Sequence, residues 1–272
     1  MKWIAVEVEG NILRLWPEGG DEIRRTLEAG VTLASLIPEI EHTVSITADT
    51  QILASGMCHE LCSGAVKSVP CRPPKARHLT PKTIQIDPRV ALVPPVMQDQ
   101  PTGVMHHEVS RIAGLIACEP SFDGVACLVG SNTVWAHISA EEIVSFQSAS
   151  TGQMMRALCG GRLRVGDGFD DALSAMMSRP QALSSRLASL QAALDLGRLG
   201  EGDLMAQMSG LLVGAELASM RPYWLGQRVA VIGEADATEP YQHGLSAQGV
   251  MVEPMSGAAL ALAGLATSQA SV

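Results

Sequence analysis

The chain has few aromatic residues, since Phe, Trp and Tyr together make up only 3% of its 272 residues. A surface that stacks nucleic-acid bases needs several aromatic rings, so the sequence argues against such a platform. The formal net charge of −9 also argues against a broad nucleic-acid footprint, although a nucleotide could still bind in a local site. We therefore expect no nucleic-acid partner.

Long apolar runs are also missing. The longest one near the C-terminus, Ala258 to Ala266, is too short to cross a bilayer. The N-terminal apolar run has one lysine ahead of it and is interrupted by Glu7 and Glu9, which fits a secretion signal poorly. We expect no membrane partner and a cytoplasmic location.

The cysteines are too few for a disulfide scaffold, because six in a chain of this length do not suggest one. Cys58, His59 and Cys62, with Cys71 nearby, have a spacing that a structural zinc site can use. A second paired set of ligands is missing, so we expect a loop with incidental thiols and no structural metal site. The run at 106–108, His-His-Glu, is too local for a helical metal motif, whose ligands lie one turn apart.

The pattern of apolar residues predicts a mixed α/β chain of one large domain or two lobes. Strands are expected at 3–8, 12–16, 51–54, within 83–93, and at 122–129, 133–138, 143–148 and 228–232. Helices are expected at 21–29, 108–118 and 151–159, and they dominate from there to residue 222, with a break at 197–202. The end of the chain alternates strand, helix, strand, helix.

One predicted helix, residues 209–221, is rich in small residues. Gly210 and Gly214 would let another backbone or a flat ligand come close, so this helix could be either a buried packing helix or a wall of a nucleotide pocket. Pro222 is expected to end it. The following strand leads to Gly233, and a small-residue helix followed by a strand that ends in glycine suits a nucleotide pocket.

The letters at 209–221, SGLLVGAELASMR, resemble a segment of the 2-keto-3-deoxygalactonate (2-dehydro-3-deoxygalactonate) kinases, which are sugar-acid kinases of the actin, hexokinase and Hsp70 superfamily. The resemblance runs nearly end to end, and the segments that carry it lie at 4–16, 28–31, 56–57, 105–108 and 130–135. It implies an α/β fold of two ribonuclease H-like lobes with a cleft between them. We place the lobes at 1–120 and 121–272.

In this superfamily each lobe is a five-stranded mixed sheet whose first hairpin turn points at the nucleotide phosphates. The resemblance implies ATP-dependent phosphorylation of 2-keto-3-deoxygalactonate at its terminal hydroxyl, with ATP and Mg²⁺ as cofactors and the sugar acid as partner. We leave a homodimer open. The residues implied are Glu7, Gly10, Arg14, Gly130, Ser131 and Asn132 for the phosphates and Mg²⁺, Gly210, Gly214 and Gly233 for adenosine, and Gly56, Met57, His106 and His107 for the substrate.

Glu108 is the candidate catalytic residue. It begins a predicted helix at the place where the family has Met-Arg-Gly-Glu, and the helix dipole there favours an ionised carboxylate that can act as a base. Related sugar kinases use a carboxylate near such a helix start to orient the hydroxyl. The other interpretation is an ordinary glutamate in the first turn of a helix.

Several phosphate motifs differ from the family pattern. Glu9 replaces a glycine of the first turn, Val134 replaces a lysine of the second, and Glu234 falls in the family's Gly-Thr-Ser. A carboxylate about 4 Å from a phosphate charge repels it by roughly 4 kcal/mol at an effective dielectric constant near 20. These differences support a second hypothesis, a degenerate kinase that binds a sugar acid or regulates another protein.

Overall fold

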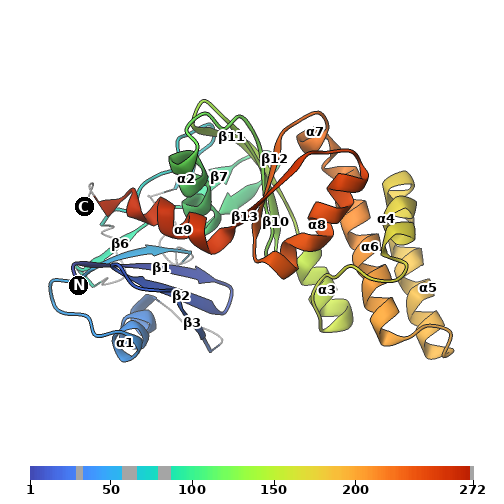
Figure 1. Ribbon diagram of the computed structural model, residues 1–272, viewed down its shortest axis with the longest axis horizontal. Helices are drawn as coiled ribbons and strands as arrows, with labels where there is room; N and C mark the ends of the chain where they lie inside the picture. The colour runs from blue at the N-terminus through green and yellow to red at the C-terminus, as the bar shows by residue number, and fades with distance from the viewer. Residues whose placement is uncertain (29–32, 57–65, 79–86, 270–272) are drawn as a thin grey trace. The chain divides into compact units, whose positions relative to one another are not determined.

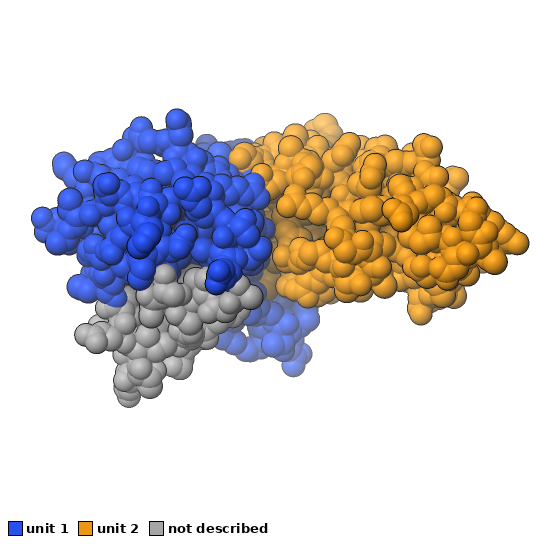
Figure 2. Space-filling model, turned by 90° about the horizontal axis from the view of Figure 1, so that it is seen from below, with its two compact units in different colours: residues 1–122, 139–145, 257–272 blue, residues 123–138, 146–256 orange. Residues whose placement is uncertain are grey.

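The structure is a computed structural model that describes residues 1–28, 33–56, 66–78 and 87–269. The chain divides into two compact units, which Figure 2 colours separately. The first contains residues 1–122, 139–145 and 257–272, and the second contains 123–138 and 146–256. The single boundary predicted near residue 120 lies close to the first of these divisions. The C-terminal helix, however, groups with the N-terminal unit.

The first unit is built on a five-stranded mixed sheet with the order β3-β2-β1-β4-β6 (Figure 1). Its strands are β1 (Trp3–Glu9), β2 (Ile12–Pro17), β3 (Ile23–Thr26), β4 (Gln51–Ser55) and β6 (Val90–Leu92). β1 pairs antiparallel with β2 and parallel with β4, and β4 pairs parallel with β6. A smaller sheet contains β5 (Lys67–Ser68), β7 (Val96–Gln98) and β8 (Gly103–Met105). The helices of this unit are α1 (Leu33–Thr43), α2 (Glu108–Cys118) and α9 (Gly257–Ala266).

Strand alternation gives the main sheet two different faces. Successive side chains of a strand point to opposite faces, so Ile4, Val6 and Val8 of β1 share one face. That face packs in a hydrophobic core with Leu36 and Ile40 of α1. The other face carries the remaining residues of β1, including its two glutamates, and α9 packs against β1 and β4. The candidate site lies on this second face.

The helices α2 and α9 pack with unusually close backbones. A Cβ atom added at Gly114 of α2 would lie 1.9 Å from the carbonyl oxygen of Leu260, and one added at Gly264 of α9 would lie 1.9 Å from that of Ser110. Neither position can carry a side chain without moving a helix. These two glycines therefore determine how closely α9 packs against α2.

The second unit repeats the five-stranded arrangement, with the order β11-β10-β9-β12-β13. Its strands are β9 (Gly124–Leu128), β10 (Thr133–Ser139), β11 (Glu142–Ala149), β12 (Val229–Gly233) and β13 (Val252–Ser256). Its helices are α3 (Thr151–Cys159), α4 (Phe169–Ser178), the 3₁₀ helix Pro180–Ala182, α5 (Leu183–Asp195), α6 (Glu201–Ser219), α7 (Arg221–Trp224) and α8 (Ala235–Ala247). β9 pairs antiparallel with β10 and parallel with β12, and β12 pairs parallel with β13. The two mixed sheets that the family resemblance implies are therefore both present.

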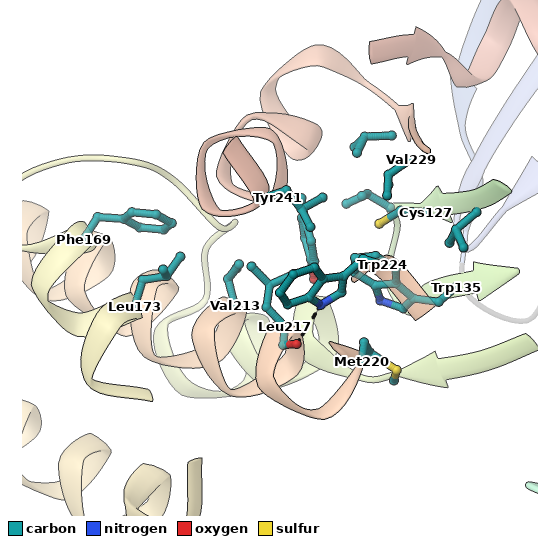
Figure 3. Packing of buried hydrophobic residues seen from close by; sticks show 14 residues of the cluster. Cys127, Trp135, Phe169, Leu173, Val213, Leu217, Met220, Trp224, Val229 and Tyr241 are labelled. Carbon is teal, nitrogen blue, oxygen red and sulfur yellow. Dashed lines mark hydrogen bonds between the residues drawn. The ribbon is translucent and has the colours of Figure 1, made fainter. Parts of the chain in front are cut away.

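The core of the second unit joins its strands to α4, α6, α7 and α8 (Figure 3). Leu173 and Val213 bring α4 and α6 into it, and Tyr241 brings α8. The indole N–H of Trp224 in α7 donates to the carbonyl oxygen of Leu217 at 2.8 Å, the dashed line in Figure 3. This bond ties α7 back onto α6.

Most predicted elements are confirmed, but two expectations are wrong. The segment at 21–29 was expected to be a helix, whereas Ile23–Thr26 forms strand β3, paired with β2. Pro222 does not end the preceding helix, because α6 already ends at Ser219. Proline lacks a backbone N–H and is tolerated in a first helical turn, and Pro222 lies in the first turn of α7. Part of the predicted strand region 83–93 lies outside the described residues.

Candidate functional site

Four charged side chains meet on the second face of the first sheet. Glu7 and Glu9 lie two residues apart on β1, so both point to this face. Arg14 of β2 is the direct cross-strand partner of Glu7, which places it on the same face. Arg111 reaches the same place from α2. We call Glu7, Glu9, Arg14 and Arg111 the ionic cluster.

The guanidinium of Arg111 binds both carboxylates of the ionic cluster. Its Nε donates to Glu7 Oε1 at 2.9 Å, and its Nη2 donates to Glu7 Oε2 at 2.8 Å. The same Nη2 lies 2.7 Å from Glu9 Oε2. Such fork-to-carboxylate pairing is the strong, directional form of an ion pair. Arg111 therefore holds the end of β1 against α2.

Arg14 completes the ionic cluster from the neighbouring strand. Its Nη1 donates to Glu7 Oε2 at 3.1 Å and to Glu9 Oε2 at 3.0 Å. Its Nε lies 3.4 Å from a carboxylate oxygen of Glu22. The formal charges of the four cluster residues sum to zero, which is why they can be buried together.

The ionic cluster is largely removed from water. The exposed fraction of the side chain is 0% for Glu7, 1% for Arg14, 2% for Arg111 and 16% for Glu9. Burial raises the pKa of Glu9, but Arg111, His107 and Arg14 together lower it to about 2. The pKa of Arg111 is raised, because its two carboxylate partners outweigh the effect of burial. Both charges are therefore fixed across the physiological pH range.

Glu108 lies next to this cluster, at the first position of α2. Its Oε2 accepts a hydrogen bond from the backbone N–H of His106 at 2.8 Å. His107 lies between the two groups, with Nδ1 at 3.6 Å from Glu108 Oε2 and Nε2 at 3.8 Å from Glu9 Oε1. Burial raises the pKa of Glu108, but His107 and backbone N–H groups outweigh it, so the pKa is lowered. Glu108 is therefore ionised at neutral pH.

Gly56 brings the end of β4 into the same region. It has a positive φ of 93°, and a Cβ atom there would lie 2.0 Å from the carbonyl oxygen of Val8 and 3.3 Å from Cβ of His107. Only glycine fits between β1 and the start of α2 in this way. Gly10 in the first hairpin turn also has a positive φ, of 59°, and is exposed.

The second hairpin turn, between β9 and β10, lies under the start of α3. The backbone N–H of Gln153 donates to the carbonyl oxygen of Ser131 at 2.9 Å, and a Cβ at Gly152 would lie 2.6 Å from the carbonyl oxygen of Gly130. Asn132 at the tip of this turn is exposed. A helix N-terminus beside a hairpin turn is an arrangement that favours an anion.

Two further positions of the second unit adjoin this turn. Gly233 ends β12 against Val129, where a Cβ would lie 2.9 Å from the carbonyl oxygen. Val134, which stands where the resembled family has lysine, is 1% exposed on β10. A lysine side chain at that position would bury a charge.

Glu216 is a buried carboxyl that the sequence analysis did not single out. It accepts hydrogen bonds from Trp135 Nε1 and from the Tyr241 hydroxyl, both at 2.7 Å. The Thr133 hydroxyl lies 2.7 Å from that of Tyr241. Burial raises the pKa of Glu216, and hydrogen bonds from Thr151 and the other partners only partly offset this. Glu216 therefore links α6 to β10, α8 and α3.

The glycines of α6 allow a helix to pack closely. A Cβ at Gly210 would lie 2.3 Å from the carbonyl oxygen of Phe169, and one at Gly214 would lie 2.5 Å from that of Leu173. Both contacts are with α4, so the close neighbour is another backbone. These contacts agree with the interpretation of this segment as a buried packing helix. We therefore do not include Gly210 and Gly214 in the proposed adenosine pocket.

The structure thus gathers the predicted residues at two places. Within the first unit it brings together Glu7, Glu9, Arg14, Gly56, His107 and Glu108. Within the second it brings together Gly130, Ser131 and the start of α3. Met57, Cys58, His59 and Cys62 lie outside the described residues. The sequence analysis did not identify Arg111 and Glu216. The signal that could have found them is a charged residue beyond the first turn of a helix, among mostly apolar neighbours.

The described residues contain no group of three or more His, Cys, Asp or Glu side chains placed to hold a metal ion. In the same part of the chain, none of the helices is long and apolar enough to span a membrane.

Comparison with known proteins gives a consistent result. The family model for 2-keto-3-deoxy-galactonokinase matches residues 18–268. The 2-dehydro-3-deoxygalactonokinase of Escherichia coli (strain K12) is 25% identical over 94% of this chain and 93% of its own. A solved Sinorhizobium meliloti protein whose name refers to the same kinase has a TM-score of 0.81 at 21% identity, and the match covers 99% of this chain and 98% of that one. It supports the fold alone.

A more distant solved structure shares the fold. Component A of the (R)-2-hydroxyglutaryl-CoA dehydratase of Acidaminococcus fermentans has a TM-score of 0.51 at 12% identity, over 96% of this chain and 95% of that one. The fold is therefore the actin-like, sugar-kinase type that the sequence predicted. Because the family model covers most of its length, the chain belongs to the 2-keto-3-deoxy-galactonokinase family of sugar-acid kinases.

Proposed function

We propose that the protein transfers the terminal phosphoryl group of ATP to the terminal hydroxyl of 2-dehydro-3-deoxygalactonate. The observation that carries this proposal is the position of Glu108, a partly buried, ionised carboxylate at the start of α2, in a chain that belongs to this kinase family. The alternative of a degenerate, non-catalytic relative is not favoured by the comparisons.

In this proposal Glu108 orients the acceptor hydroxyl. Phosphoryl transfer passes through a loose transition state, so the attacking hydroxyl needs positioning more than early deprotonation. A carboxylate with a lowered pKa suits that role, because it accepts a hydrogen bond from the hydroxyl and takes the proton late. The bond from the His106 N–H to Oε2 fixes this carboxylate.

We assign the remaining groups around it to the two substrates. Gly56, His106 and His107 would line the sugar-acid side, since His107 lies beside Glu108 and Gly56 packs against His107. The exposed Gly10 and the turn at Gly130, Ser131 and Asn132 would present backbone N–H groups and polar side chains to the ATP phosphates. Gly233 would border the nucleotide on its adenosine side.

The kinase family implies a divalent metal with ATP, and the ionic cluster is where a protein-held Mg²⁺ was predicted. Glu7 does not fit that role, because its two carboxylate oxygens already accept three hydrogen bonds from Arg14 and Arg111. We therefore assign no step to a magnesium ion bound by Glu7.

The test is a steady-state assay of ADP formation from ATP with three candidate acceptors. We expect turnover with 2-dehydro-3-deoxygalactonate, less with its 4-epimer 2-dehydro-3-deoxygluconate, and none with galactonate, which lacks the keto group. Mass spectrometry of the product should show one added phosphoryl group. A purified, folded protein that forms no ADP with any of the three would contradict the proposal and revive the degenerate alternative.

A further inference from the structure

The two carboxylates at the end of β1 already have a cation, and it belongs to the protein. Arg111 donates to both oxygens of Glu7 and to Glu9 Oε2. Arg14 Nη1 adds a bond to each carboxylate, at 3.1 Å to Glu7 and 3.0 Å to Glu9. A carboxylate has about four lone-pair positions, so Glu7 has little capacity left for a metal.

The position of Arg111 also makes exchange with a metal ion costly. It is 2% exposed and comes from α2, whose packing on α9 is fixed by the close glycine contacts. To expose the carboxylates, the guanidinium would have to leave a buried, neutral cluster and remain buried without a partner. A Mg²⁺ ion next to two guanidinium groups would also meet their repulsion.

We propose that Arg111 is the resident cation of the Glu7–Glu9 pair and takes the place of a magnesium ion held by this unit. Metal then reaches the protein only on the phosphates of its nucleotide. Arg111 acts as a positioning residue, since it fixes the two carboxylates and through them the first hairpin turn. The inference deepens the proposed function, but its test needs neither ATP nor a sugar acid, so the two can fail separately.

The test is a titration of the full chain with Mn²⁺ at neutral pH without nucleotide, in which electron paramagnetic resonance measures the bound Mn²⁺. With Arg111 retained, the single substitutions Glu7→Gln and Glu9→Gln should each change the Mn²⁺ affinity by less than twofold. Arg111→Met keeps an unbranched stem of four heavy atoms but removes the guanidinium end and its charge. It should create a site that binds Mn²⁺ at least tenfold more tightly than the parent does, and Arg111→Met with Glu7→Gln should lose that gain.

Arg186→Met is the control, because Arg186 is exposed on α5 and its loss changes the net charge by the same amount. It should leave Mn²⁺ binding unchanged. The proposal is overturned if the parent binds Mn²⁺ and Glu7→Gln or Glu9→Gln abolishes that binding, or if a folded Arg111→Met variant shows no gain. If circular dichroism shows that Arg111→Met does not fold, the two glutamine variants of the parent decide the question alone.

Discussion

At the residue scale, Glu9 shows how a charge can be accommodated where the resembled family has a glycine. Considered alone, its carboxylate would repel a phosphate. In the structure it is paired with Arg111 and Arg14, and its charge is balanced within the ionic cluster. The repulsion expected from the sequence is therefore weakened by neighbours that lie 5 and 102 residues away along the chain.

The lowered pKa of Glu9 predicts acid sensitivity. Its pKa falls from 4.5 to about 2 in the folded protein, so the ionised form stabilises the fold above pH 4.5 and this contribution is lost as the pH falls from 4.5 toward 2. By linkage the loss is at most about 3 kcal/mol. Urea unfolding at pH 7, 5, 4 and 3 measures it. Glu9→Gln should flatten the decline, whereas Glu239→Gln, on the exposed side of α8, should follow the parent. A Glu9→Gln profile as steep as the parent's would contradict the assignment.

Glu108 gives the second prediction at this scale. Glu108→Gln keeps the size of the side chain but removes its negative charge, and it should lower kcat by about 10²–10⁴-fold, the usual contribution of a general base. The KM for ATP and the melting temperature should change little. The assay of ADP formation measures this, with Glu239→Gln as the matched control. A kcat within a few-fold of the parent would exclude Glu108 as the base.

At the element scale, alternation and capping signals were enough to locate most of the fold. The helix at 108–118 and the two hairpins lie where the sequence predicted them, because their apolar periods are regular. The segment at 21–29 was misread because Glu, Arg and Leu favour helices, while pairing with β2 decides the outcome. Glu7, Arg14 and Glu108 were identified as candidates. Arg111 was not, because its partners lie more than 100 residues away.

The packing of α2 on α9 gives a prediction with an internal control. Gly264→Ala adds a methyl group where Ser110 carbonyl oxygen is 1.9 Å away, so the helices must separate, at a cost of about 1–3 kcal/mol or more. Gly202→Ala, in the first turn of α6, meets nothing within 4 Å and should be neutral or stabilise by up to about 1 kcal/mol. Urea unfolding compares the two. Equal effects would show that helix propensity, not close packing, governs both positions.

At the scale of the whole molecule, both units use one strand order, although the sequence shows no internal repeat. Each begins with a hairpin and continues with two parallel strands. Among its described residues the first unit has α1 between its third and fourth strands, whereas the second unit inserts α3 to α7 there. This insertion makes the similarity between the two units hard to detect in the sequence, because matching strands are separated by segments of very different length.

The shared strand order leads to the last prediction, which concerns the nucleotide. If the actin-like fold is used as the resemblance implies, the first hairpin turn of each unit contacts ATP phosphates. Hydrogen exchange with the non-hydrolysable analogue AMP-PNP and Mg²⁺ tests this. Backbone amides at 10–12 and at 130–132 should both be protected, because bound phosphate oxygens accept hydrogen bonds from them. Residues 183–195 of α5, which has no buried side chain, serve as the reference, and their exchange should not change when the analogue binds. Protection of one turn alone, under conditions where the analogue raises the melting temperature, would contradict a phosphate contact at the other turn.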